Sequence, residues 1–276
     1  MSKLKTPLRY PGGKSRAVKQ ILEYIPEDIT SLCSPFFGGG SVELALANKG
    51  VYVHGYDKFA PLVWFWHALI EDNKLLAGEV KKLRDDYTVL TGEKKVEVTG
   101  CSKELFNSIR KDLKSSDDSF SYEKAAKFYV INRTSFSGAT FSGGWSKLAS
   151  YKRFTQSSID RIEDFRAKNF SVAREDFKDS IVSTSCDHYY LDPPYLLEKN
   201  NTLYGDSGDM HKDFDHEGLY DILSKKTGWT LSYNDCPTIR EMYSGRKIYT
   251  PSWSYGMKQR SENTKKKNSS ELIIVG

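Results

Sequence analysis

Hydrophobic positions divide the chain into short apolar runs that alternate with amphipathic stretches of helical period. The runs have the length and the β-branched or aromatic content of strands. They cover residues 29–34, 51–57, 169–173, 187–191, 228–233, 247–250 and 271–275. Helical periodicity predicts helices over residues 14–24, 42–46, 59–71, 159–165 and 215–226. The alternation predicts an α/β protein with helices packed on one sheet.

This alternation lapses between residues 73 and 155. The stretch is interpreted as a charged helical run over 81–86, a loop or hairpin over 91–100 and an amphipathic helix over 122–132. The sequence therefore predicts one α/β domain from residues 1–72 and 156–276, interrupted by a mostly helical domain from residues 73–155.

Composition restricts the class of protein. The 276 residues are 38% hydrophobic and 28% charged, enough for a full core. No apolar run approaches 18 residues and no leader is apparent, so we expect a cytoplasmic protein without a membrane span. The four cysteines are widely spread without a C-x-x-C pair, which favours reduced thiols over a zinc site.

Positive charge is concentrated in two segments. Residues 1–20 contain six basic side chains and no acid, and residues 258–267 contain five basic side chains and one acid. The formal net charge is +5. Two basic segments fit contacts with nucleic-acid phosphates, although solvated terminal segments are the alternative.

A glycine turn follows the first predicted strand. Pro-Phe-Phe-Gly-Gly-Gly at 35–40 leads into a helix, as in a nucleotide-binding βα unit. Asp57 ends the next strand, 17 positions beyond Gly40, near the spacing at which an acid meets ribose hydroxyls. The turn lacks the G-x-G-x-x-G order and a phosphate-binding lysine. A ligand with a ribose but no pyrophosphate is favoured, and S-adenosylmethionine fits better than NAD or ATP.

A second glycine turn lies near the N-terminus. Gly-Lys-Ser at 13–15 suggests a P-loop, but that motif needs glycine where Leu8 stands. Lys14 at a helix start could bind a carboxylate or a phosphate. An ordinary capped helix is the alternative.

Asp-Pro-Pro-Tyr at 192–195 directly follows a predicted strand. Two successive prolines supply no backbone N–H and end the ladder. Asp192 and Tyr195 are therefore expected on a stiff turn at the carboxyl edge of the sheet, where α/β proteins bind ligands. A Pro-rich turn with a capping Asp and a packed Tyr is the alternative.

The middle of the chain contains a segment without helix or strand period. Glycines, hydroxyls, aromatic rings and basic residues mix over 132–138, 141–145 and 151–154. Such a segment suits a loop that contacts nucleic acid, although ordinary packed loops have similar compositions. Histidines 211 and 216 stand among acids but lack metal-ligand spacing, so no metal site is predicted.

Together these motifs resemble one family. Tyr-Pro-Gly-Gly-Lys at 10–14, Ser-Pro-Phe-Phe-Gly-Gly-Gly at 34–40 and Asp-Pro-Pro-Tyr at 192–195 occur in the order seen in Dam-like (D12 class) N6-adenine DNA methyltransferases. The resemblance spans nearly the whole chain. It implies a Rossmann-like S-adenosylmethionine-dependent methyltransferase fold with a mixed seven-stranded sheet. Residues 73–155 would be the inserted target-recognition domain.

The resemblance also implies roles for individual residues. Asp192 and the Pro193 carbonyl would accept hydrogen bonds from N6 of an adenine flipped out of double-stranded DNA, and Tyr195 would stack on its ring. The residues expected around S-adenosylmethionine are Tyr10, Lys14, Phe36, Gly38, Gly40, Asp57, Asp176 and Asp192. Lys14 and Tyr10 would meet its carboxylate, Asp57 its ribose and Asp176 its adenine.

DNA contacts are expected from the middle loop. Arg133 would contact DNA and Phe136 would fill the space left by the adenine, with further contacts from Ser137, Lys152 and Arg153. The loop departs from the form linked to GATC, so no recognition sequence is predicted. Cytosine-N4 methylation and an inactive DNA-binding homologue are the alternatives. A cognate restriction endonuclease, a monomer or weak dimer, and a bacterial or phage-infected cell are further expectations.

Overall fold

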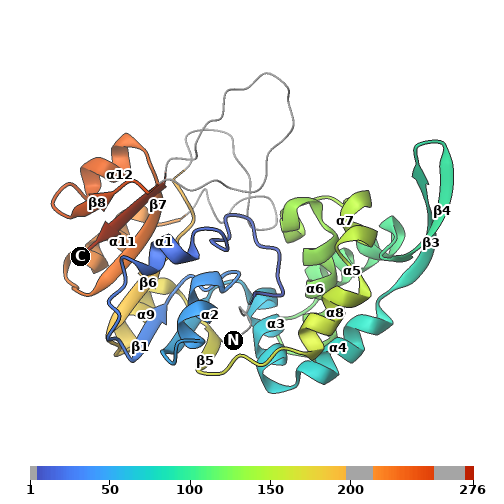
Figure 1. Cartoon of the computed structure of the whole chain (residues 1–276), viewed down its shortest axis with the longest axis horizontal. Helices are drawn as coiled ribbons and strands as arrows, with labels where there is room; N and C mark the ends of the chain where they lie inside the picture. The colour runs from blue at the N-terminus through green and yellow to red at the C-terminus, as the bar shows by residue number, and fades with distance from the viewer. Residues whose placement is uncertain (1–4, 197–213, 252–270) are drawn as a thin grey trace.

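The computed structural model describes residues 5–196, 214–251 and 271–276, and a seven-stranded sheet forms its centre (Figure 1). The strand order is β5-β2-β1-β6-β7-β9-β8. The strands are β1 (Ser31–Ser34), β2 (Tyr52–Asp57), β5 (Phe170–Arg174), β6 (His188–Leu191), β7 (Trp229–Asn234), β8 (Lys247–Tyr249) and β9 (Glu271–Val275). Strand β9 runs antiparallel to both neighbours, whereas β5, β2, β1, β6 and β7 are parallel. All seven predicted strands are present, so the prediction of a mixed α/β sheet is confirmed.

Helices accompany the strands along the chain. They are α1 (Val18–Leu22), α2 (Ser41–Ala47), α3 (Ala60–Glu71), α9 (Phe177–Ser183), α11 (His216–Ser224) and α12 (Pro237–Met242). Helix α8 (Gln156–Glu163) instead packs against α4 (Asn73–Lys82), within the helical part of the molecule (Figure 1). The first helix is much shorter than the predicted 14–24. Gly12 takes a positive φ of 68° and the Gly13 N–H donates to Tyr10 O, so a turn precedes it.

Residues 73–152 form a helical unit beside the sheet (Figure 1). It contains α4 (Asn73–Lys82), the hairpin β3 (Asp85–Thr91) and β4 (Lys94–Gly100), α5 (Lys103–Ser115), α6 (Tyr122–Thr134), two 3-10 turns, η1 (Phe136–Gly138) and η2 (Thr140–Ser142), and α7 (Lys147–Lys152). The predicted hairpin is present, but the predicted helical run over 81–86 is wrong. It divides between the end of α4 and the start of β3 because the hairpin pairs residue 85 with residue 100.

The helical unit shares its core with the sheet. Helix α6 packs against α3 and α4, and the rings of Tyr129 and Phe65 stack with centroids 5.5 Å apart. One buried hydrophobic cluster includes residues from both parts. The core is therefore continuous between the two parts, and the division into two domains at residues 73 and 155 stays a prediction.

Phe37 fixes the glycine turn onto the sheet. Its ring is 2% exposed, meets Trp66 edge-on at 5.1 Å and stacks on Phe170 at 5.9 Å. Gly55 on β2 makes room for it, since a Cβ there would lie 2.7 Å from the ring atom Cε2. The turn at 38–40 is thereby held at the carboxyl end of β1.

The sheet reverses its order of growth between β1 and β6. From β1 the chain continues to β2 on one side, and from β6 it continues to β7 on the other. In open α/β sheets, ligands bind in the crevice at the carboxyl ends of the strands flanking such a switch point. Here those ends lead directly into the glycine turn and into Asp192.

We expect Gly55→Ala to lower the free energy of unfolding by about 1–3 kcal/mol, because the new methyl group overlaps the Phe37 ring. Gly78→Ala is the matched control. A Cβ at 78 meets nothing within 4 Å on helix α4, so it should raise stability by about 0.5–1 kcal/mol. Chemical denaturation of both variants checks this, and equal stability would contradict the packing described.

Candidate active site

The glycine turn between β1 and α2 is fixed by hydrogen bonds on both sides. Gly38 and Gly40 have positive φ values of 49° and 65°, a conformation that favours glycine. The Asp57 carboxylate accepts from the backbone N–H groups of Gly38 and Phe59, both at 3.0 Å. The Trp66 indole N–H donates to Gly38 O at 3.0 Å. The turn is thus preorganised before any ligand binds.

Tyr10 lies against this turn. A Cβ on Gly38 would be 3.1 Å from its ring atom Cε1, and one on Gly39 would be 2.8 Å from its Cβ. The structure therefore brings together four of the residues predicted around the cofactor, namely Tyr10, Gly38, Gly40 and Asp57.

Asp57 is buried at the end of β2. Burial raises the pKa of its carboxyl group to about 6, while the bonds from the Phe59 and Gly38 N–H groups oppose that shift. Each carboxylate oxygen already accepts one N–H and has a further lone pair. Asp57 can therefore accept additional bonds from hydroxyl groups.

Phe36 and Asp176 lie at the neighbouring helix α9. The Phe36 ring packs against Phe177 and Phe214, each at 5.6 Å between centroids. Asp176 caps α9 by accepting from the Lys178 N–H at 3.0 Å, and it pairs with Lys58 Nζ at 3.0 Å. The helix-cap role of Asp176 is observed, and its approach to an adenine stays a prediction.

Asp192 forms a partly buried ion pair at the end of β6. Lys14 Nζ lies 2.6 and 2.7 Å from its two carboxylate oxygens and 3.0 Å from Gly12 O. The side chains are 4% exposed for Lys14 and 21% for Asp192. Burial raises the Asp192 pKa and the Lys14 ammonium opposes that rise. Lys14 was predicted to meet a cofactor carboxylate, and here its ammonium is on the carboxylate of the protein itself.

Glu271 completes this corner and was not singled out from the sequence. It is 2% exposed on β9, opposite Asn234 of β7. The Tyr195 hydroxyl donates to its Oε1, and Lys14 Nζ lies 3.7 Å away from the same atom. The one available sequence signal was an acid opening the apolar strand Glu-Leu-Ile-Ile-Val.

Tyr195 has a fixed ring orientation. Its ring stacks with that of Tyr233 at 6.0 Å, and Lys14 Nζ lies 5.1 Å from its centroid. Burial, together with the nearby carboxylates, raises its pKa well above the ordinary value. The hydroxyl therefore stays protonated and acts as a hydrogen-bond donor.

Glu43 is a second buried acid that sequence reasoning missed. It stands in the first turn of α2, 3% exposed, and accepts from Ser34 Oγ at 2.8 Å. Burial, helped by the charge of Asp192, raises its pKa to about 7. A glutamate in a first helical turn ordinarily faces solvent, so its sequence position gave no indication of burial.

The middle loop follows α6 directly. Phe136 is 62% exposed, whereas Asn132 is fully buried. Ser137 has a positive φ of 56°, an uncommon backbone conformation for a residue other than glycine. Such strain persists only where surrounding contacts fix it, and here the loop presents an aromatic ring to solvent.

Arg133 is buried rather than presented on the surface. Its guanidinium donates to the carbonyls of Arg153 and Pro7, with Nε 3.0 Å from Arg153 O. It therefore joins the N-terminal segment to the end of α7, and its predicted contact with DNA stays a prediction. Lys152 and Arg153 are exposed beside it.

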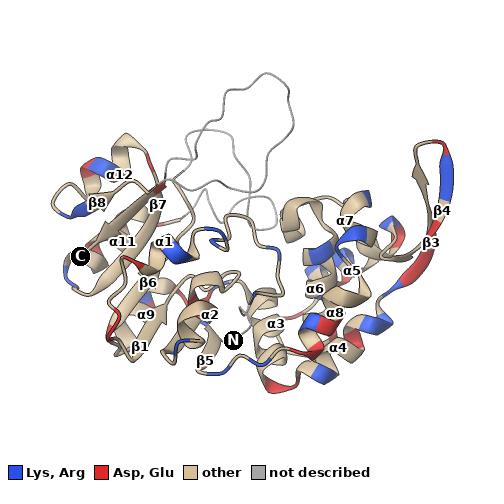
Figure 2. Ribbon diagram, in the orientation of Figure 1, with Lys and Arg blue, Asp and Glu red and all other residues tan. Residues whose placement is uncertain are grey.

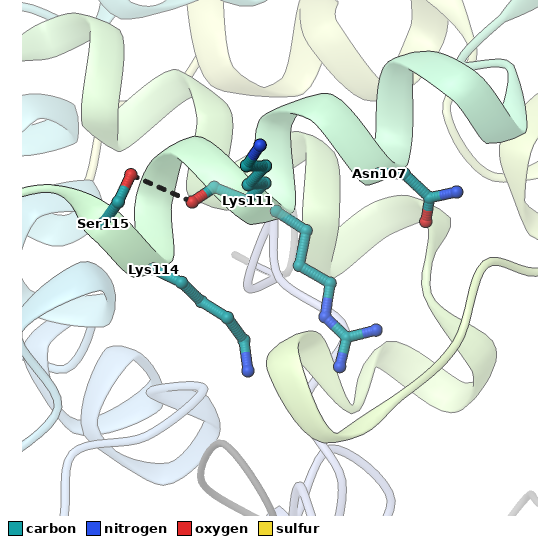
Figure 3. Close-up of a pocket in the computed structure, with 5 residues that line it drawn as sticks. Asn107, Lys111, Lys114 and Ser115 are labelled. Carbon is teal, nitrogen blue, oxygen red and sulfur yellow. Dashed lines mark hydrogen bonds between the residues drawn. The ribbon is translucent and has the colours of Figure 1, made fainter.

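A basic groove lies along α5 (Figure 3). Its volume is about 480 Å³ and its lining residues are Asn107, Arg110, Lys111, Lys114 and Ser115. Arg110 donates to the Phe141 carbonyl, so the groove adjoins the middle loop. Figure 2 shows Lys and Arg residues both on the N-terminal segment and on α5 and α7.

Among the described residues, no group of three or more His, Cys, Asp and Glu side chains could hold a metal ion. His216 is bonded through Nδ1 to the Tyr233 hydroxyl, and His211 lies outside the described residues. In the same part of the chain no helix is long and apolar enough to cross a membrane.

The strand order, with one antiparallel strand inside an otherwise parallel arrangement, is that of a S-adenosylmethionine-dependent methyltransferase. The chain belongs to the D12 class N6 adenine-specific DNA methyltransferase family, whose model matches residues 10–257. It is accordingly an adenine-specific DNA methyltransferase that uses S-adenosylmethionine, and the resemblance in the motifs is confirmed.

The chain is also similar to two curated methyltransferases. The chain is 26% identical over 205 residues to the type II methyltransferase M.MjaIII of Methanocaldococcus jannaschii, covering 68% of each chain. It is 23% identical over 201 residues to the type II methyltransferase M.CviBI of Paramecium bursaria Chlorella virus NC1A. That match covers 70% of this chain and 69% of the relative.

The buried carboxyl group of Glu43 predicts that the stability of the fold depends on pH. A carboxyl whose pKa is raised on folding binds its proton more tightly in the folded protein. Its contribution is therefore greatest at low pH and is lost as pH rises from about 4.5 through about 7.

Glutamine does not titrate, so Glu43→Gln should not lose stability over this pH range. The free energy of unfolding of the variant minus that of wild type should therefore be larger at pH 8 than at pH 5. Denaturation at both pH values checks this. Glu217→Gln, in the exposed first turn of α11, is the control and should follow wild type. The same difference in the free energy of unfolding between Glu43→Gln and wild type at both pH values would argue against a buried titrating acid.

Proposed function

We propose that this enzyme methylates N6 of an adenine flipped out of double-stranded DNA at a specific sequence, with the corner at Asp192 as its catalytic site. The observation that carries the proposal is the placement of Asp192 beside the glycine turn, across the switch point between β1 and β6. A base inside a duplex cannot bring N6 to such a recessed carboxylate, so the adenine must leave the stack.

Two acceptors would orient the amino group. Asp192 accepts a hydrogen bond from one N6–H and the Pro193 carbonyl accepts one from the other. This directs the nitrogen lone pair toward the methyl donor. Catalysis then depends mainly on alignment and electrostatics. N6 becomes acidic as it is methylated, and its proton leaves toward Asp192 or solvent.

Lys14 limits how Asp192 can act. Its ammonium lies on both carboxylate oxygens, so the adenine amino group must use their remaining lone pairs. The Lys14 ammonium favours the ionised form of Asp192 and so opposes the burial that raises its pKa. Lys14 is thus proposed as the residue that keeps the acceptor charged and in one orientation.

The glycine turn suits the nucleoside part of the cofactor. Gly38 and Gly40 let the backbone approach a ligand closely, and Asp57 offers acceptors for ribose hydroxyls. Phe36 and Tyr10 supply apolar surface beside them. S-adenosylmethionine supplies the methyl group when bound there, and we propose Asp176 near its adenine.

The helical unit would contact DNA. Exposed Phe136 is suited to fill the space vacated by the adenine, with Ser137 beside it. Lys152, Arg153 and the basic groove on α5 are suited to phosphates. In this proposal residues 73–155 form the target-recognition domain, and residues 1–72 with 156–276 form the catalytic domain.

Further partners belong to the same proposal. The two relatives are named type II methyltransferases, which supports a cognate restriction endonuclease in the same system. We propose a monomer or weak dimer that works in the cytoplasm of a bacterial or phage-infected cell.

Asp192→Asn should lower methyl transfer by at least about 10²-fold, because an amide directs N–H donors at an amino group that needs acceptors. Incubation of DNA with labelled cofactor, followed by nucleoside mass spectrometry, checks this and should find N6-methyladenine with wild type. Asp160→Asn on α8 is the control. Cytosine-N4 product would refute the adenine assignment, and DNA binding without product would indicate an inactive homologue.

Lys111→Gln combined with Lys114→Gln should reduce the slope of log affinity against log salt by about 2, roughly 0.9 for each lost phosphate contact. DNA titrations at several salt concentrations measure it. The control is Lys49→Gln with Lys225→Gln, which removes the same charge. These exposed lysines precede the amino ends of β2 and β7, opposite the carboxyl ends where the proposed site lies. Identical slopes in the two double variants would exclude the α5 groove from the interface.

A further inference from the structure

The segment from Arg9 to Lys14 contacts three functional parts of the molecule. At one end it bonds to Asn132 of α6 and packs on Gly138 of the middle loop, in its centre it covers the glycine turn, and at its other end Lys14 holds Asp192. These contacts join places that are far apart in the sequence.

Asn132 fixes the first end. The Arg9 N–H donates to Asn132 Oδ1 at 2.9 Å, and Asn132 Nδ2 donates to Arg9 O at 2.6 Å. One buried amide therefore satisfies both main-chain groups of a residue 123 positions away. It also donates to Gly138 O at 3.4 Å, which includes the loop in the same contact.

Gly138 adds direct packing between loop and segment. It has a positive φ of 76°, and a Cβ there would overlap the Arg9 carbonyl. The Arg9 side chain in turn donates to Arg133 O at 3.5 Å. The loop that carries Phe136 therefore packs directly on the Arg9 backbone.

The path from Arg9 to Lys14 is short and stiff. The Gly13 N–H closes a turn onto Tyr10 O at 3.0 Å. The Tyr10 ring rests on Gly38 and Gly39, so the turn cannot shift without changing the cofactor side of the crevice. Lys14 follows immediately, with its ammonium held between Asp192 and Gly12 O.

We propose that the segment Arg9–Lys14 couples the DNA-reading loop to the catalytic carboxylate, with Asn132 as the positioning residue at its loop end. The coupling rests on the proposed function for its biological meaning, but the mechanical link is a property of the free protein. Contact of DNA with the loop shifts Arg9, and this shift changes how Lys14 holds Asp192. A correctly read sequence thereby sets the geometry of the acceptor for N6.

The first test follows the Lys14 ammonium by 15N NMR, with its signal assigned by its loss in Lys14→Met. Short duplexes that together contain adenine in every four-base context are titrated, and at least one of them should shift this signal in wild type. Asn132→Asp keeps the acceptor for the Arg9 N–H but loses the donor to Arg9 O, so it should abolish the shift while DNA still binds. An unchanged shift in Asn132→Asp would overturn the proposal.

Asn73→Asp is the matched control. The Asn73 amide is equally structural, donating to the carbonyls of Ile162, Glu163 and Phe165, but it is remote from the N-terminal segment. It should retain the shift. If Asn132→Asp does not fold, Gly138→Ala displaces Arg9 from the loop side and serves as the second variant.

Kinetics supply a second test. Asn132→Asp should lower kcat about tenfold with DNA affinity changed less than twofold, and it should have no further effect in a Lys14→Met background. Additive losses would mean that Asn132 acts by another route. Absence of methyl transfer by wild type would instead refute the proposed function, and the NMR result would still decide the coupling.

Discussion

The ion pair between Lys14 and Asp192 is the interaction on which the site depends. Both charges lie in a largely buried corner, where an isolated carboxylate would take up a proton rather than stay ionised. The lysine comes from the N-terminal segment and the aspartate from the end of β6, so the pair also closes the chain across the sheet edge. Its geometry requires the strand order that makes β1 and β6 neighbours.

The corner around this pair contains more acidic than basic side chains. Glu43, Asp192 and Glu271 are all buried or nearly so, and Lys14 is within 4 Å of the last two. Three ionised carboxylates with one cation would be unfavourable at low local polarity. Burial raises the pKa of Glu43 to about 7, so this carboxyl group holds a proton more readily than an ordinary glutamate does. The corner therefore attracts positive charge, a useful property in a site for a sulfonium cofactor.

Sequence patterns predicted the sheet well because its strands are short apolar runs bounded by turn residues. All seven strands and the glycine turn followed from local rules. The first helix was predicted too long because apolar spacing does not locate helix ends, and residues 15–17 and 23–24 form turns. Glu43, Glu271 and the partner of Lys14 were missed because each depends on contacts between segments remote in the sequence. Arg133 shows the same limit, since a basic residue in a loop gives no sign that backbone carbonyls surround it.

The place of β9 in the sheet makes the catalytic corner depend on a pairing between remote segments. This strand lies between β7 and β8 and pairs antiparallel with both. Glu271 opens it and accepts the Tyr195 hydroxyl. The glycine turn is held instead by Asp57 and Trp66, which come from β2 and α3. Local opening of β9 would therefore release the anchor of Tyr195 while the cofactor turn kept its hydrogen bonds.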